Sequence, residues 1–203
     1  MSYATDSELV ERALGGSPEA YGDLVLRYQR PVFSLIVRMV RNGAIAEELA
    51  QDVFIKAYHH LGSFDPRRKF SSWLFKVAHN ATIDHLRRRQ LATVPLEPEE
   101  GEGPRLAELL SGPESEGPEG QAMRSELARA LDEALAELRP EHREILLLRF
   151  GQGLSYSELA EVLGLALGTV KTHIHRARKR LARILEDSEW DPREPPGDEA
   201  RKE

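Results

Sequence analysis

Two long stretches of this chain carry apolar residues at intervals of three and four positions, with a segment rich in proline, glycine and glutamate between them. Such intervals place apolar side chains on one face of a helix, and no strand-like alternation competes with them. Residues 95–120 hold five Pro, five Gly and eight Glu, too polar a composition to offset the entropy of ordering. We therefore expect an all-α protein of two small helical domains joined by a flexible acidic linker.

The same patterns give the expected boundaries. The first domain spans residues 1–92, the linker 93–124 and the second domain 125–186. Within the linker, the apolar residues of 106–110 allow one helical turn. Residues 187–203 hold three Pro and an acidic excess, so we expect a disordered tail there.

Composition excludes several classes of protein. The 203 residues include no Cys, which excludes disulfides, thiolate metal sites and cysteine nucleophiles. No apolar run approaches the length of a membrane span, and the N-terminus lacks the basic start and apolar core of a secretion signal. We therefore expect a cytoplasmic protein without membrane insertion. The net charge of −6 resides in the linker and the tail, which leaves residues 131–186 slightly basic.

The second domain shows the pattern of a helix-turn-helix. Ser155 and Glu158 form a capping box that opens a short helix. Ala160, Gly164 and Val170 fall where this motif requires close packing, a tight turn and an apolar anchor. The spacing predicts a second, longer helix directly after the turn.

That longer helix is predicted to have one apolar and one cationic face, with six Lys or Arg and no acidic residue between positions 169 and 185. A major groove admits such a helix, and residues near its N-terminus usually meet base edges. The candidate base-edge contacts are Lys171, Thr172, His175 and Arg176. The candidate phosphate contacts are Arg178, Lys179 and Arg183. Because His173 and His175 are only two positions apart, we expect no metal site on this helix.

The first domain carries a second candidate surface for nucleic acid. A predicted helix from about 71 to 89 gathers its polar residues in one arc, and aromatic residues alternate with cations just before it. Rings and cations together suit single-stranded DNA, since bases stack on the rings and phosphates meet the cations. We expect Trp73 and Phe75 in the core and Phe64 in contact with DNA. The other candidate contacts are Arg67, Arg68, Lys69, Lys76, Asn80, Asp84 and Arg87.

Four segments of the chain resemble motifs of the extracytoplasmic-function (group IV) sigma factors of bacterial RNA polymerase: 47–58, 70–80, 154–160 and 168–178. Together they occur in the order and spacing of that family. The resemblance implies a first domain of the sigma region 2 type, a bundle of helices. It implies a second domain of the sigma region 4 type, which holds the helix-turn-helix.

The resemblance also implies a role for each surface. The first domain would bind the clamp helices of the largest subunit of core RNA polymerase through Glu48, Gln51 and Asp52, although their composition alone indicates only a solvated helix face. Its last helix and preceding loop would read the minus-ten element of promoter DNA as a melted single strand. The second domain would read the minus-thirty-five element as duplex and contact the flap of the second-largest subunit. The resemblance implies no enzyme, no cofactor and no metal, and it allows an anti-sigma factor as a further partner.

Three other interpretations remain open from the residues. A conventional helix-turn-helix regulator with a helical sensor domain would leave the aromatic and cationic pattern before residue 89 without a purpose. A metal-dependent enzyme would need His79, Asp84 and His85 to converge near His59 and His60, and their helical positions do not share one face. A module that binds only protein would not need the six basic residues of the last helix.

Overall fold

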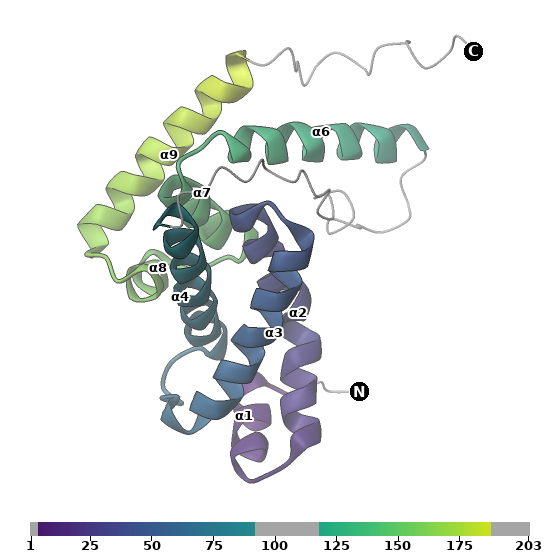
Figure 1. The fold of residues 1–203 in the computed structure, drawn as a ribbon, viewed down its shortest axis with the longest axis vertical. Coiled ribbons are helices and arrows are strands. Elements are labelled where there is room, and N and C mark those ends of the chain that lie inside the picture. The colour runs from purple at the N-terminus through teal and green to yellow at the C-terminus, as the bar shows by residue number, and fades with distance from the viewer. Residues whose placement is uncertain (1–3, 92–117, 188–203) are drawn as a thin grey trace.

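The computed structural model describes residues 4–91 and 118–187, and these ranges consist of helices joined by short turns (Figure 1). The first unit contains α1 (Asp6–Leu14), α2 (Pro18–Val40), α3 (Gly43–His60), the 3-10 turn η1 (Leu61–Ser63) and α4 (Phe70–Leu91). The second unit contains α6 (Pro118–Ala136), α7 (Pro140–Leu146), the π-helical turn η2 (Leu147–Gly151), α8 (Tyr156–Leu163) and α9 (Leu167–Asp187). The predicted all-α class is confirmed for these ranges.

Side chains that cap the helices explain where most elements of the first unit begin. Thr5 opens α1 as a capping box, and the Ser17 hydroxyl accepts a hydrogen bond from the main-chain nitrogen of Ala20 at the start of α2. Asn42 caps α3 in the same manner. α2 runs through Pro31 without a break, because the side chains on both sides of that position pack into the core.

The second unit begins earlier than the sequence indicates. α6 starts at Pro118, within the range 93–124 that we expected to be linker, and proline suits the first turn of a helix. The helical turn expected at 106–110 lies outside the described residues, as does the expected tail beyond Asp187. In the described part of the chain, no helix is both long enough and apolar enough to cross a membrane.

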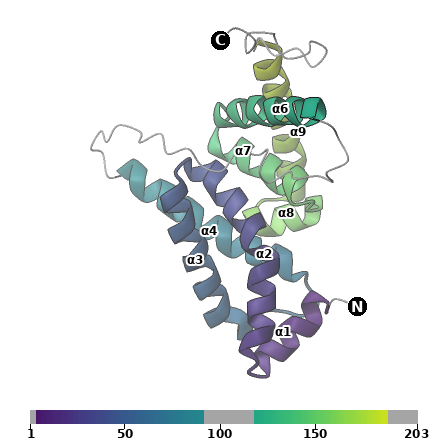
Figure 2. The ribbon, with the colours of Figure 1, turned by 90° about the vertical axis from the view of Figure 1, so that its right-hand side faces the viewer.

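The two units lie against each other. Figures 1 and 2 show α8 beside α4, and α7 beside the C-terminal end of α2. Their buried apolar side chains form one continuous cluster, which includes Leu35 and Phe75 from the first unit and Ile145 and Leu159 from the second. Expectations from the sequence treated the two domains separately, so this shared interface is a new feature of the structure.

Candidate nucleic-acid interfaces

The helix-turn-helix forms as the capping and glycine pattern predicted. The Ser155 hydroxyl accepts a hydrogen bond from the main-chain nitrogen of Glu158 at 3.2 Å, and the Glu158 carboxylate accepts one from the nitrogen of Ser155 at 2.6 Å. Gly164 ends α8 with a φ of 66°, the left-handed conformation that glycine adopts without strain. Leu165 then donates a main-chain hydrogen bond to the carbonyl of Ala160 at 3.0 Å. This turn directs the chain into α9.

The predicted division of α9 into two faces is confirmed. Its buried side chains are Val170, Ile174, Ala177 and Ile184, which pack on the rest of the second unit. Its exposed side chains include every candidate for duplex contact: Lys171, Thr172, His175, Arg176, Arg178, Lys179 and Arg183. None of the cations among these forms an ion pair with another residue in the described ranges. A cationic helix face therefore stands open to solvent.

His173 differs from its neighbours on α9 because it packs inward. Its ring meets that of His142 on α7 edge-on, with 5.9 Å between the ring centroids. Burial lowers the pKa of His142; Glu141 opposes the shift, while the charges of His173 and Arg176 add to it. This contact supports the packing of α7 on α9, which leaves His175 as the exposed histidine of the pair.

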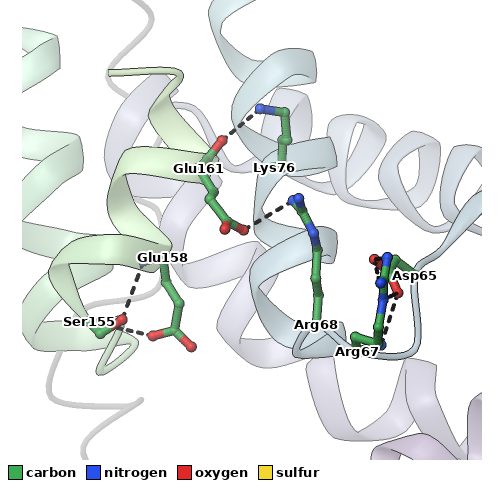
Figure 3. A network of polar contacts seen from close by, with 7 residues as sticks. All are labelled: Asp65, Arg67, Arg68, Lys76, Ser155, Glu158 and Glu161. Carbon is green, nitrogen blue, oxygen red and sulfur yellow. Dashed lines mark hydrogen bonds and ion pairs between the residues drawn. The ribbon is translucent and has the colours of Figure 1, made fainter. Parts of the chain in front are cut away.

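In the loop before α4, one carboxylate organises the cations. Asp65 accepts hydrogen bonds from the main-chain nitrogen of Arg67 at 3.1 Å and from its guanidinium Nε and Nη2 at 2.9 and 2.8 Å (Figure 3). These side-chain and main-chain hydrogen bonds lower the pKa of Asp65 to about 2. The guanidinium of Arg67 nevertheless remains 88% exposed, so it stays available to a ligand.

The expectation that Phe64 offers an exposed ring is wrong. Phe64 is only 7% exposed, and its ring lies 5.8 Å from that of Phe70 and 5.5 Å from that of Trp73 between centroids. The three rings close the end of the helical bundle beneath the loop, because burying them stabilises the fold more than leaving one in water. Phe75 is buried, as expected, whereas Trp73 is half-buried and packs against the core from its edge.

The polar arc of α4 is exposed as predicted, but its N-terminal end touches the second unit. Lys76, Asn80, Asp84 and Arg87 are all exposed on α4. Three cationic side chains, two in the loop just before α4 and one on α4 itself, form ion pairs or hydrogen bonds with α8. We call these three the α4 cations: Arg68, Lys69 and Lys76. The candidate surface for single-stranded DNA is therefore partly occupied.

Deeper in the same interface lie polar contacts that the sequence did not reveal. His79 Nδ1 on α4 lies 2.6 Å from Glu144 Oε1 on α7, and the side chain of Glu144 is only 3% exposed. Arg38 on α2 pairs with Asp132 on α6 at 2.9 Å. No local pattern could have revealed these pairs, since their members are more than 60 positions apart in the chain.

Arg143 forms hydrogen bonds with both units at this junction. Its guanidinium is buried and donates to main-chain carbonyls of both units. In the first unit it reaches Arg38 at 3.1 Å and Met39 at 3.4 Å, where α2 ends. In its own unit the acceptors are the carbonyls of Leu135, Ala136 and Leu138. Burial lowers the pKa of Arg143, with a smaller effect from the charge of Arg41.

The candidates for contact with polymerase lie on α3. Glu48, Gln51 and Asp52 are all exposed, and Gln51 lines a hollow of about 700 Å³ between α2 and α3. Ile55 borders the hollow and is 56% exposed. Its position off the apolar stripe of the helix could have drawn attention to this surface, but the composition of the polar residues here indicated only a solvated helix face.

The residues of the metal-enzyme interpretation do not converge. His79 pairs with Glu144 of the other unit. The pKa of half-buried His85 is lowered, first by burial and then by the neighbouring charges of Arg88 and Arg89. Among the residues that the structure describes, no three His, Asp or Glu side chains are grouped to hold a metal ion.

Comparison with known families covers both units. The sequence model of Sigma-70 region 2 matches residues 24–92, and that of Sigma-70, region 4 matches residues 128–181. The chain is 34% identical over 180 residues to the ECF RNA polymerase sigma factor SigW of Bacillus subtilis, covering 88% of this chain and 95% of that one. It is also 34% identical over 179 residues to the ECF RNA polymerase sigma-E factor of Escherichia coli, covering 87% and 92%.

Solved structures agree with these matches. The structure of CnrH in complex with the cytosolic domain of CnrY has a TM-score of 0.65 and 29% identity, and the match covers 90% of this chain and 99% of that one. The sigma factor RpoE of Bartonella quintana, in complex with the anti-sigma factor NepR, has a TM-score of 0.62 at 24% identity over 83% and 98%. The second likeness shows the fold alone.

Proposed function

This chain belongs to the extracytoplasmic-function sigma factors, which direct RNA polymerase to promoters, and we propose that two of its surfaces divide promoter recognition between them. The exposed cationic face of α9 reads the minus-thirty-five element as duplex DNA. The exposed arc of α4 and the loop before it read the minus-ten element as a melted single strand. The chain acts as an initiation factor and leaves the chemistry of transcription to polymerase.

The open cationic face of α9 is the observation that carries the proposal. Lys171, Thr172, His175 and Arg176 lie in the first half of the helix, which is the part that reaches base edges when such a helix enters a major groove. Cations further along it, such as Lys179 and Arg183, suit phosphates, which fix register but not sequence. The buried opposite face holds α9 rigidly in place.

On the first unit, Asn80 and Asp84 occupy the exposed centre of the α4 arc and can form hydrogen bonds with unpaired bases. The α4 cations, together with Arg67 and Arg87, supply charge for the phosphates of the strand. Opening the duplex and extruding a base costs a few kcal/mol, which contacts with polymerase and with the strand must offset.

We assign the contact with core polymerase to α3. Glu48, Gln51 and Asp52 face solvent there, and the hollow beside Gln51 adds apolar surface for the clamp helices of the largest subunit. The second unit contacts the flap of the second-largest subunit. An anti-sigma protein is a further partner, because the structural neighbours CnrH and RpoE were both solved with another protein bound. The protein bound to RpoE is named as an anti-sigma factor.

The test is transcription in vitro with sigma-free core polymerase and a pool of promoters, with the transcripts sequenced. We expect discrete start sites that appear only with this protein, and that change when Asn80→Ala or Arg176→Ala replaces the native chain. Matched controls are Asn42→Ser, a conservative change at the cap of α3, and Arg139→Ala, an exposed position just before α7. Direct duplex binding with no initiation would instead support a conventional regulator.

A further inference from the structure

The side of α8 that faces α4 presents acidic groups to the cations that we assign to single-stranded DNA. Glu161 Oε2 accepts from Arg68 Nη1 at 3.2 Å, and the main-chain carbonyl of Glu161 accepts from Lys76 Nζ at 2.6 Å (Figure 3). Glu158 Oε1 pairs with Lys69 Nζ at 2.9 Å. All three α4 cations are therefore engaged by one short helix of the other unit.

We propose that the free chain holds itself in a closed state in which Glu158 and Glu161 occupy the positions of DNA phosphates on the α4 cations. The inference rests on the proposed role of Arg68, Lys69 and Lys76 in binding the melted strand. A carboxylate and a phosphate accept hydrogen bonds from the same ammonium and guanidinium groups, so these contacts and strand binding compete. The second unit must move away before the strand can bind.

The buried contacts of the interface explain why α8 meets α4 at this position. His79 and Glu144 pair where the two units are most deeply packed, and Arg143 ties the second unit to the end of α2. These contacts set the orientation of the second unit. In that orientation, the acidic residues of α8 lie against the loop before α4. The charged contacts therefore form the edge of a specific interface.

The charged edge is weak enough to be reversible. Arg68 and Glu161 are 58% and 49% exposed, so water and salt screen their ion pair; Lys69 is 73% exposed but Glu158 only 17%, so the second pair is screened less. An exposed pair contributes at most about 1 kcal/mol, which is about fivefold in an equilibrium constant. Polymerase and DNA can therefore open the chain without having to break a strong electrostatic bond at the edge.

The first measurement is the distance between the units. Because the chain has no cysteine, Cys introduced at the exposed positions of Glu11 on α1 and Ala182 on α9 can carry two spin labels without competition. We expect one narrow distance distribution for the chain with native Glu158 and Glu161. In the E158Q/E161Q double variant we expect a longer, broader component, and Gln keeps the capping box of α8 intact.

The second measurement is the affinity for a fluorescein-labelled single strand of random sequence, followed by anisotropy. We expect E158Q/E161Q to bind about tenfold more tightly, within the limit set by two exposed ion pairs. The matched control, E137Q/E186Q, removes the same two charges at exposed positions outside the α4–α8 contact. It should leave both the distances and the affinity unchanged.

Four outcomes overturn part of this picture in distinguishable ways. A broad distance distribution in the native protein overturns the closed state, even if the protein initiates transcription with core polymerase. Equal behaviour of the two double variants overturns the role of Glu158 and Glu161 in holding that state. A variant that opens without binding the strand more tightly overturns the competition with DNA. The native protein can also be closed and the variant open while neither initiates transcription with core polymerase. That outcome overturns the proposed function on which the inference rests.

Discussion

The two candidate DNA surfaces of this molecule differ in what covers them. On α9 the cations face solvent and form no ion pair with another described residue. Around the start of α4, three cationic side chains are in contact with α8. The first surface is open to a ligand, whereas on the second two carboxylates and a main-chain carbonyl of α8 occupy the cations.

This difference indicates an order of events. A preformed helix face can meet duplex DNA at once, because the duplex presents its grooves without being melted. A surface for single-stranded DNA is needed only after the duplex opens. Contacts with the protein's own α8 therefore block no DNA binding that is required before that step. The residues proposed to contact polymerase are exposed on α3, whereas the α4–α8 contact involves α4 and the loop before it, so we propose that polymerase can bind while that contact opens.

The largest effect is expected from Arg143→Ala, which removes the tie between the units. The buried guanidinium donates to five main-chain carbonyls, and the substitution leaves several of them without a donor. We expect the free energy of unfolding to fall by roughly 3–5 kcal/mol. Urea unfolding followed by circular dichroism measures the change.

The matched control for that variant is Arg139→Ala, an exposed arginine just before α7 whose nearest carboxylate is 3.9 Å away. It should change the free energy of unfolding by less than about 0.5 kcal/mol. Equal effects of the two substitutions would show that Arg143 does not hold the units together.

The next effect is expected from Arg176→Ala on the open surface of α9. If Arg176 reads a base edge, discrimination between promoter variants should weaken by about 1–3 kcal/mol at one position of the minus-thirty-five element. Transcription from a promoter library with every base tested at each position measures this. A uniform loss over all positions would instead assign Arg176 to phosphate contact.

A smaller effect is expected from Lys179→Ala, which lies further along α9 than the base-edge candidates. Loss of one phosphate contact should weaken binding about equally for all sequences and reduce the slope of log affinity against log salt by about one. Titrations of the polymerase complex on promoter DNA at several salt concentrations measure the slope. An unchanged slope with altered sequence preference would place Lys179 on a base edge.

The sequence predicted what depends on neighbours along the chain. The capping box at Ser155 and the left-handed turn at Gly164 are local, because each depends on residues within one or two helical turns. The two faces of α9 follow from helical periodicity alone. These features were sufficient to predict the cationic face of α9, which is the candidate duplex surface.

The sequence could not predict what depends on contacts between distant segments. The ring of Phe64 is buried because Phe70 and Trp73 fold over the same spot, and a pattern of aromatic residues beside cations is equally typical of a core edge and of a stacking surface. Glu158 was visible only as a capping residue, although the structure gives its carboxylate a second partner in Lys69. A residue with one partner in its own helix and another in the other unit can be recognised only when the positions of both units are known.

The smallest expected effect is a change in the pKa of Glu158, and it reports directly on whether α8 contacts the loop. Burial raises this pKa, but hydrogen bonds from Lys69 and from both the main chain and the hydroxyl of Ser155 outweigh burial and lower it from 4.5 to about 2. Because the folded pKa is depressed, the stabilisation is complete above about pH 4.5 and is lost as the pH falls through about 2. Lys69→Met removes one donor and its charge, so the pKa should rise toward its ordinary value.

Carbon-13 NMR of the Glu158 carboxyl between pH 7 and pH 3 measures this change. The native carboxyl should remain ionised over nearly the whole range, whereas in Lys69→Met it should begin to take up a proton at a higher pH. Lys56→Met, the same substitution at an exposed position of α3, should leave the titration curve of Glu158 unaltered. If Lys69→Met also leaves it unaltered, Lys69 does not contact Glu158 in solution. Lys69 would then be as open as the cations of α9, and the contrast between the two surfaces would rest on Arg68 and Lys76 alone.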